Sequence, residues 1–308
     1  MMLFNVIIVW LWRQWMEHLT ALQELQKENV INNIYINDPF NKNIEHIYTS
    51  NIIQIHTITD ITEYKIDFGI VSTPNILQAD IVKILIENGI HILKEKPFFM
   101  DSITMNTMLS LAQERSVIIK CAQQREYNGM YSILEKYISQ LWQIHLVNYD
   151  FTLNDKNNSW YWEQELGWWV FYGLTWHCLH FYIKFFWIPK RFIVKKVNSS
   201  SRPWKYNSDD SNFVTLEYQN GMIGSIYTSV VSPAKRESIE IHGSNGTLFL
   251  NRHDICVIIS WVETIYPVSF SNGYKEQILD FIHLISSEKW TFIDKNSQAI
   301  LSLIESSL

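Results

Sequence analysis

The sequence predicts a two-domain protein, with an α/β domain on a doubly wound parallel sheet followed by an α+β domain on an open, mostly antiparallel sheet. Apolar runs alternate with amphipathic helical segments over residues 1–122, which is typical of a parallel sheet. Short strands separated by turn signals such as Asn220-Gly221 follow, which is typical of an antiparallel sheet. A length of 308 residues suits two domains, since one domain usually takes about 100–200. We place these domains at residues 1–122 and 123–308.

The composition describes a globular chain whose partner is a small molecule. The net charge is −6, from 25 basic and 31 acidic residues, so the basic patch typical of nucleic-acid binding is not expected. The longest apolar runs fall short of the about 20 residues that a membrane-spanning helix needs. The apolar start at residues 1–12 lacks a basic segment and a cleavage site, and we expect a buried first strand there. Three widely spaced cysteines indicate no metal site and a reducing, cytoplasmic location.

Residues 67–97 are the segment around which the first domain is organised. They comprise an apolar segment, the turn Thr73-Pro74-Asn75, an amphipathic helix at about 76–88, a second apolar segment and the close Glu95-Lys96-Pro97. The carboxyl ends of parallel strands meet at one edge of a sheet, where such sheets bind ligands. We therefore expect both tripeptides to face one crevice. The alternative for Glu95 and Lys96 is an exposed ion pair of little energetic value.

The first strand and helix are expected at residues 3–9 and 16–28, with an unusual loop between them. Trp10, Trp12 and Trp15, with Arg13 and Gln14 between, have the spacing of G-x-G-x-x-G, the dinucleotide fingerprint. The glycines of that motif permit a tight turn, close approach of the pyrophosphate and close helix packing. An indole at each position fills that space, so the loop as written should not bind a dinucleotide in the usual way.

Asp38 follows the second expected strand, residues 31–36. An acidic residue at this point can accept a hydrogen bond from the ribose 2′-hydroxyl of NAD, which disfavours NADP. The same Asn37-Asp38-Pro39 stretch is also ordinary turn chemistry. Both interpretations stay open.

The remaining elements are expected from periodicity and turn signals. Asp101 should cap a helix that ends near residue 115, and two helices, at 274–287 and 295–307, close the chain. The other expected helices are at 44–50 and 130–140, and the other strands at 52–59, 117–121, 144–153, 192–197, 213–219, 222–231, 237–242, 247–250 and 255–261.

The two tripeptides at this spacing resemble the Gfo/Idh/MocA family, named for glucose-fructose oxidoreductase and inositol dehydrogenase. The resemblance implies a Rossmann domain that binds NAD, with NADP as the alternative. It places Lys96 beside nicotinamide and substrate, Glu95 near the cofactor ribose, and Pro97 commonly in the cis form. It also implies cofactor contacts from the loop at residues 10–15 and from Thr73, Pro74 and Asn75.

Two segments of the second domain also resemble the family. Residues 123–128, which include Arg125, are similar to its domain-junction segment and imply a contact from Arg125 to cofactor or substrate; the alternative is the first turn of a helix. Residues 167–180 resemble its D-x-x-x-H-x-x-D helix, with His177 as the candidate general base. Gly173 and His180 replace the two aspartates, which leaves open what orients His177. A satisfied core histidine is the competing interpretation.

The function implied is hydride transfer between a nicotinamide cofactor and the carbinol carbon of a sugar, cyclitol or related small molecule, without a metal. Lys96 and His177 are the expected catalytic residues. The alternative is a non-catalytic relative with a degraded cofactor loop, used for binding or assembly. The resemblance also implies a homo-oligomer formed through the second-domain sheet.

The tryptophans carry a hypothesis of their own. Glycine numbers 10 and tryptophan 13, whereas glycine is ordinarily about 7% of residues. Seven tryptophans stand where the fold or the family places glycine, and substitution in one direction seven times is improbable on stability grounds. We hypothesise that these are UGA codons that the source organism reads as glycine. The seven are Trp10, Trp12, Trp15, Trp142, Trp168, Trp169 and Trp187.

Overall fold

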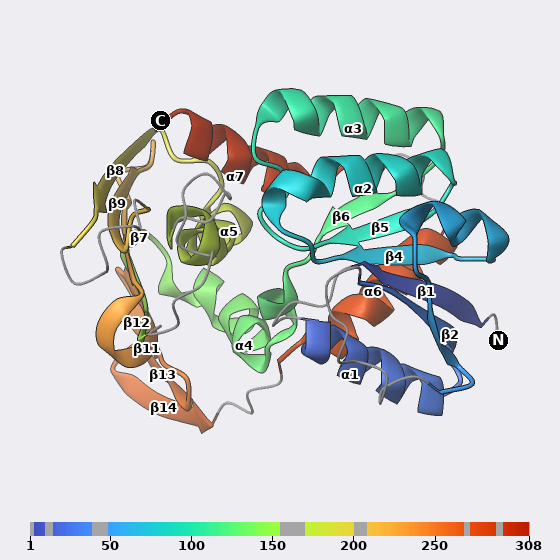
Figure 1. The fold of residues 1–308 in the computed structure, drawn as a ribbon. Coiled ribbons are helices and arrows are strands. Elements are labelled where there is room, and N and C mark those ends of the chain that lie inside the picture. Colours follow the sequence, from blue (N-terminus) through green and yellow to red (C-terminus); the bar gives the residue numbers. More distant parts are fainter. Residues whose placement is uncertain are drawn as a thin grey trace. The chain divides into compact units, whose positions relative to one another are not determined.

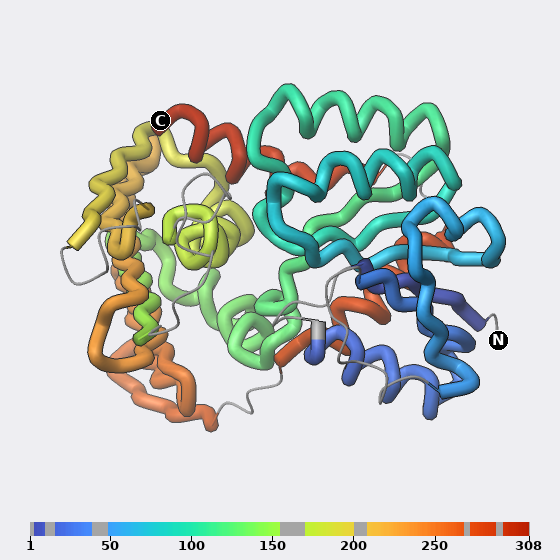
Figure 2. The backbone as a smooth tube through the Cα atoms, viewed as in Figure 1, coloured from blue at the N-terminus to red at the C-terminus, as the bar shows by residue number. Residues whose placement is uncertain are grey.

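The computed structural model describes residues 3–9, 15–38, 49–154, 170–199, 208–267, 272–287 and 292–307, with Trp15 described by its backbone alone. The chain forms two compact units (Figures 1 and 2). The first comprises residues 1–124 and 273–298, and the second residues 125–272 and 299–308. The predictions for Trp10, Trp12, Arg13, Gln14, Trp168 and Trp169 fall outside the described residues, as does the helix expected at 44–50 except for its last two residues, where Thr49 forms a β-bridge with Ile52.

The first unit is built on a six-stranded parallel sheet with the order β3-β2-β1-β4-β5-β6. This order is that of a doubly wound Rossmann sheet, which confirms the predicted fold class. Helices α2 and α3 cover one face and α1 and α6 the other (Figure 1). The elements are β1 Phe4–Val9, α1 Trp15–Lys27, β2 Ile31–Asn37, β3 Ile52–Gln54, β4 Phe68–Val71, α2 Asn75–Glu87, β5 His91–Lys94, α3 Ser102–Glu114, β6 Ile119–Cys121 and α6 Tyr274–Ser286.

Helix α6 belongs to the first unit, although its residues were predicted to lie in the second domain. Its apolar stripe is buried in the core that β1, β2 and α1 share, and the Phe281 ring lies edge-on to Phe68 with centroids 5.5 Å apart. Figure 2 shows this late segment beside the blue start of the chain. Sequence order alone did not indicate this return, because a stripe at helical spacing does not identify the sheet that covers it.

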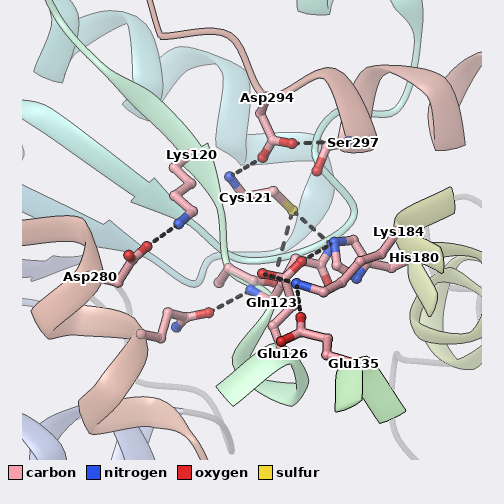
Figure 3. Close-up of polar contacts among 12 residues, drawn as sticks. Lys120, Cys121, Gln123, Glu126, Glu135, His180, Lys184, Asp280, Asp294 and Ser297 are labelled. Carbon is pink, nitrogen blue, oxygen red and sulfur yellow. Dashed lines mark hydrogen bonds and ion pairs between the residues drawn. The ribbon is translucent and has the colours of Figure 1, made fainter. Parts of the chain in front are cut away.

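The carboxyl-terminal part also anchors β6. Lys120 Nζ lies 2.5 Å from Asp280 Oδ2, and the Cys121 amide donates to Asp294 Oδ2 at 2.9 Å (Figure 3). The other Asp294 oxygen accepts the Ser297 amide at 3.0 Å, at the start of α7 (Lys295–Glu305). Asp294 therefore fixes this segment to the edge of the parallel sheet.

The second unit is built on an eight-stranded sheet with the order β14-β13-β12-β11-β7-β10-β9-β8. All neighbours are antiparallel except β7 and β10, as predicted for a mostly antiparallel sheet. The strands are β7 Ile144–Asn154, β8 Arg191–Val197, β9 Ser211–Glu217, β10 Ile223–Ser229, β11 Val231–Gly243, β12 Gly246–Leu250, β13 Asp254–Ile259 and β14 Val262–Pro267. Its α-helices are α4 Gly129–Tyr137, α5 Trp176–Phe186, which follows a π-helical turn, Phe171–Thr175, and the part of α7 from Ala299 onward.

One face of this sheet forms the core of the second unit. Side chains alternate between faces along a strand, and the cross-strand row Val194, Val214, Ile226, Tyr149 and Ile239 is paired in register. All but the edge-strand Val194 are buried. On that side the hydroxyl of Tyr182 in α5 donates to the carbonyls of Val147 and Ser225 at 2.8 and 2.9 Å.

Strand β14 was not predicted. The expected strand over residues 255–261 ends at Ile259, and the chain reverses through Ser260 and Trp261, with φ of 50° and 69°. A two-residue hairpin turn with two positive φ angles normally carries Asn-Gly or a similar pair. Ser-Trp gives no such signal, so the turn could not be recognised.

Two of the seven tryptophans of the hypothesis also have left-handed backbones. Trp142 has φ 61° and ψ −120°, and Trp187, which ends α5, has φ 68° and ψ −165°. Both are 79% exposed and Trp261 is 99% exposed, whereas Trp176, inside α5, is fully buried. Backbone near φ +60° with ψ close to 180° is almost exclusively adopted by glycine. Trp187 lies in this region, and the positive φ of Trp142 and of Trp261 also disfavours a side chain there.

Candidate active site

The turns at residues 73–75 and 95–97 lie at the same edge of the parallel sheet. Val71, at the end of β4, pairs with Lys94, at the end of β5, and the Glu95 amide donates to the Val71 carbonyl at 2.8 Å. The chain therefore leaves both strands side by side. The prediction that the two tripeptides share one edge of the sheet is confirmed.

The turn at 73–75 leads directly into α2. Pro74 is the N-cap and has φ −51°, which suits a residue just before a helix. Thr73 and Asn75 are almost fully buried. The Gln78 side chain, one turn into α2, donates to the Thr73 carbonyl at 2.8 Å. This hydrogen bond fixes the turn to its helix.

Glu95 is a buried carboxylate with a buried histidine as its partner. His18 Nε2 lies 2.9 Å from Glu95 Oε1, and the Lys96 amide donates to Glu95 Oε2 at 3.3 Å. Burial raises the pKa of Glu95, but the hydrogen bond and charge of His18 and the charge of Lys96 outweigh it, so the pKa is lowered overall. The carboxyl group is therefore held ionised.

His18 was not among the residues predicted for the site. It lies on α1, three residues after Trp15, and its ring is edge-on to Tyr274 with centroids 4.7 Å apart. Its burial is complete. The sequence shows that His18 lies in the first turn of α1. It does not show that this turn contacts Glu95, just after β5, because that contact depends on how α1 packs in the folded unit.

Lys96 lies directly after Glu95 and precedes a cis peptide bond to Pro97. It is 8% exposed, so its chain is largely enclosed at the carboxyl edge. An amine with little solvent around it interacts strongly with a polarised oxygen, because water no longer screens the charge. This position suits a group that donates a hydrogen bond or a proton to a bound carbonyl oxygen.

Asp38 lies at the carboxyl end of β2, next to β1 in the sheet. It is 6% exposed. The neighbouring Asn37 side chain donates to the Ile55 carbonyl at 2.9 Å, which fixes the end of the strand. A carboxylate here is placed to accept hydrogen bonds from the hydroxyls of a nucleoside ribose. This role stays a prediction.

His177 lies on α5 in the second unit, buried with its ring 6.5 Å from that of Phe151. One helical turn on, His180 Nε2 lies 2.9 Å from Glu126 Oε1 (Figure 3). Lys184 Nζ also approaches the other oxygen of Glu126, at 3.9 Å. The carboxylate at this part of α5 is therefore supplied by the 123–128 segment, and Gly173 lies in the π-helical turn before α5.

Arg125 is held by a buried cluster of the second unit. It forms an ion pair with Glu237, which also accepts the Tyr149 hydroxyl at 2.7 Å, and its guanidinium lies 4.4 Å above the Phe151 ring. Burial opposes the charge of Arg125, but Glu237 outweighs it and raises the pKa. The predicted contact from Arg125 to cofactor stays a prediction.

Two buried atoms at the first-unit site fit a polar ligand. In the part of the chain that the structure describes, Thr73 Oγ1 and His18 Nδ1 are buried and have no hydrogen-bond partner. Buried polar groups of this kind are usually satisfied. With the carboxylates of Asp38 and Glu95 at the same sheet's carboxyl ends, they fit a dinucleotide that carries ribose hydroxyls and amide groups.

Among the described residues, no group of three or more His, Cys, Asp or Glu side chains could hold a metal ion. Over the same ranges, no helix has the length and apolar character needed to cross a membrane.

Two protein-family models match the chain. Residues 11–123 match the oxidoreductase family model of the NAD-binding Rossmann fold, and residues 133–249 match the Gfo/Idh/MocA carboxyl-terminal domain model. Among curated protein sequences, none matches the chain. The first unit is thus an NAD-binding Rossmann domain.

Solved structures share the fold at low sequence identity. A 3-ketoreductase from Actinomadura kijaniata, in complex with NADP and TDP-benzene, is 14% identical with a TM-score of 0.86, covering 99% of this chain and 97% of its own. Biliverdin reductase from Synechocystis sp. PCC 6803, with biliverdin and NADP+, is 13% identical with a TM-score of 0.82, covering 98% and 97%. UDP-N-acetylglucosamine 3-dehydrogenase from Acidithiobacillus ferrooxidans is 13% identical with a TM-score of 0.81, covering 100% and 97%. Together with the two family models and the geometry at residues 73–75 and 95–97, these matches lead to one conclusion: the chain belongs to the Gfo/Idh/MocA family of oxidoreductases.

Proposed function

We propose that this chain is an NAD(P)-dependent oxidoreductase that transfers a hydride between a nicotinamide cofactor and a hydroxyl or keto carbon of a sugar, cyclitol or related small molecule. The observation that carries the proposal is the position of Lys96 and Glu95 beside the 73–75 turn, at the carboxyl edge of a sheet with Rossmann order. This edge is where such sheets bind dinucleotides.

The residues take distinct roles in this proposal. The nicotinamide, when bound, supplies or accepts the hydride. Lys96 polarises the reacting oxygen and His177 exchanges its proton, since a neutral imidazole has a suitable pKa of about 6.5 near neutral pH. Asp38 and Glu95 bind the two ribose units.

The substrate class is supported by one relative whose name contains a sugar, the UDP-N-acetylglucosamine 3-dehydrogenase. A second relative, the 3-ketoreductase solved with NADP and TDP-benzene, supports reduction of a keto group. Biliverdin reductase shares the fold as well, so the fold leaves the substrate open. We favour a sugar or polyol derivative over a tetrapyrrole, because a hydroxyl on carbon requires the acid–base pair that Lys96 and His177 provide.

A non-catalytic relative is the second candidate. It is favoured by the three tryptophans at positions 10, 12 and 15, where the dinucleotide fingerprint requires glycine. If these tryptophans are glycine in the natural protein, this candidate loses its main support. If they are tryptophan, a binding or assembly function is preferred.

Cofactor titration separates the two candidates. NADH and NADPH are titrated by nucleotide fluorescence into the chain as written and into a variant with Trp10→Gly, Trp12→Gly and Trp15→Gly. The proposal expects micromolar binding of NADH to the glycine variant, and oxidation of NADH with a keto-sugar panel. Absence of binding and turnover in both proteins contradicts it.

A further inference from the structure

Lys94 is a fully buried lysine that the proposed chemistry does not use. It is the last residue of β5 and has no exposed surface. Lysine is almost never fully buried unless its ammonium group is paired. Lys94 directly precedes the 95–97 turn, which contains Lys96, and is not part of that turn.

The Lys94 ammonium group has three oxygen partners. It donates to the side-chain oxygen of Gln78, to the Glu95 carbonyl at 3.0 Å and to the Pro97 carbonyl at 2.6 Å. Three partners match the three protons of an ammonium group. Two of these oxygens belong to the 95–97 turn itself, so one side chain holds the turn on both sides of Lys96.

Gln78 extends these contacts to the other turn. It is 3% exposed in the first turns of α2, and its amide nitrogen donates to the Thr73 carbonyl at 2.8 Å. Its carbonyl oxygen accepts from Lys94 at the same time. A continuous set of hydrogen bonds therefore runs from Thr73 through Gln78 and Lys94 to Glu95 and Pro97.

We propose that Lys94 and Gln78 form a buried clamp that fixes the 95–97 turn to the 73–75 turn and thereby positions Lys96 for catalysis. The proposal rests on the proposed function for its catalytic consequence. Lys94 has no exposed surface, so it acts as a positioning residue. Small displacements of a reacting group are costly, because the rate depends on near-attack geometry.

The chemistry of the clamp explains why an apolar residue cannot replace Lys94. Methionine fills the same volume but leaves the carbonyls of Glu95 and Pro97 without their donor, and each buried unsatisfied group costs about 1–3 kcal/mol. Burial lowers the pKa of Lys94 to about 7. Measurements at pH 6 therefore keep all three protons on the amine.

Hydrogen exchange at pH 6 tests the clamp without any cofactor. In Lys94→Met, the backbone amides of Thr73 and Asn75 and those of residues 95, 96, 98 and 99 should exchange at least tenfold faster, while the α1 and α3 amides keep their rates. The matched control is Lys83→Met, an exposed lysine of α2, which should change neither turn. Unchanged exchange in both turns, or a uniform increase across the whole first unit, overturns the proposal.

Two variants of Gln78 separate the two links. Gln78→Glu keeps an oxygen for Lys94 but has no proton for the Thr73 carbonyl, so only the 73–75 turn should exchange faster. Gln78→Met removes both links and should loosen both turns, which keeps the test decisive if Lys94→Met does not fold. Equal effects of the two variants on both turns contradict the clamp.

Steady-state kinetics of the Lys94→Met variant tests whether the clamp affects catalysis. In the glycine variant of the cofactor loop, Lys94→Met should lower kcat by about 10–100-fold with KM changed less than threefold, since a displaced Lys96 affects the transition state more than substrate binding. An unchanged kcat with faster exchange overturns the positioning role. If no variant turns over, the proposed function fails, and the exchange data still decide whether the clamp exists.

Discussion

Three tryptophans with positive φ angles bear on the hypothesis that some tryptophans of this sequence are glycine in the natural protein. Trp142, Trp187 and Trp261 have φ between 61° and 69° and lie exposed. A side chain at such a position costs about 1–3 kcal/mol, and an exposed indole returns little of that cost through burial. The structure thus adds a backbone reason to the composition argument, at two predicted positions and at one that sequence analysis did not include.

Glycine at these three positions should stabilise the protein. Trp142→Gly, Trp187→Gly and Trp261→Gly should each raise the free energy of unfolding by about 1 kcal/mol, because the left-handed strain disappears. Urea unfolding measures this. The control is the fully buried Trp176, where Trp176→Gly should cost more than about 3 kcal/mol. In the gene, UGG codons at Trp10, Trp12 and Trp15 end the recoding hypothesis, whereas UGA there, with UGG at Trp162 and Trp176, supports it. The backbone adds the expectation of UGA at Trp142, Trp187 and Trp261.

The catalytic lysine gives a second prediction at this scale. Lys96→Ala should lower kcat/KM by about 10²–10⁴-fold, the usual contribution of a positioned acid or base. His177→Ala should cost less, since neither aspartate of the family's helix is present to orient it. The measurement is NADH oxidation with the best keto-sugar. An active enzyme that tolerates Lys96→Ala contradicts the assigned role, and Lys83→Ala serves as the surface control.

The His18–Glu95 pair predicts a pH dependence of stability. The pKa of Glu95 is lowered in the folded state, so the pair's stabilisation is present above the unfolded pKa of about 4.3 and is lost as pH falls through the folded value. His18→Phe leaves a buried carboxylate without its partner, which should cost about 3 kcal/mol at pH 7.

Acid unfolding followed by circular dichroism checks this dependence. The midpoint should move to higher pH in His18→Phe, because the pKa of Glu95 then rises with burial unopposed by the histidine. His145→Phe, at an exposed position of β7, is the control and should leave the midpoint in place. A His18→Phe midpoint equal to that of the unmodified chain refutes the pairing.

At the scale of elements, prediction succeeded where local signals agreed. Residues 67–97 combine helical periodicity, turn residues and apolar strands, and β4, α2 and β5 lie close to the expected bounds. Strand β14 was not predicted, because the pair Ser260-Trp261 is not a typical sequence for a two-residue hairpin turn. The contacts of Gln78 and Lys94 could not be predicted, because they join a helix to a strand through side chains. The only sequence feature that pointed to these contacts was Lys94, a charged residue at the end of the otherwise apolar strand β5.

Helix α6 offers a prediction about the first unit. Phe281 is fully buried against Phe68, so Phe281→Ala should cost about 3–5 kcal/mol. The effect should fall on the parallel-sheet unit, and hydrogen exchange in β1 and β4 should increase more than in β7. The exposed Leu279 on the same helix provides the control Leu279→Ala. Equal loss of protection in both units contradicts the assignment of α6 to the first unit.

At the scale of the whole molecule, the outer face of the eight-stranded sheet is the proposed surface for self-association. A row in register runs from Ile193 on β8 to Ile265 on β14 and includes Phe249, while Phe213 and Tyr227 are paired beside it. All five are exposed. The apolar side chains lie on the β8–β10 and β12–β14 parts of this face, with Asn148 on β7 and Glu240 on β11 between them. Exposed apolar side chains rimmed by polar ones favour an interaction surface, and a second copy offers the same face in a two-fold dimer.

We therefore expect the chain to form a homo-oligomer through this face. Charged residues introduced on the face should disrupt it. Phe213→Glu with Ile265→Glu should lower the sedimentation mass to that of a monomer, because each dimer would bury four unpaired carboxylates, and a buried unpaired charge costs several kcal/mol. The control is Ile103→Glu, at an exposed position of α3 in the first unit, which should leave the mass unchanged. A double variant that keeps the oligomeric mass shows that another surface forms the contact, and a monomeric unmodified chain excludes self-association through the sheet. Circular dichroism of the double variant should match that of the unmodified chain, because both substitutions are on the exposed face and leave the opposite, buried face of the sheet intact.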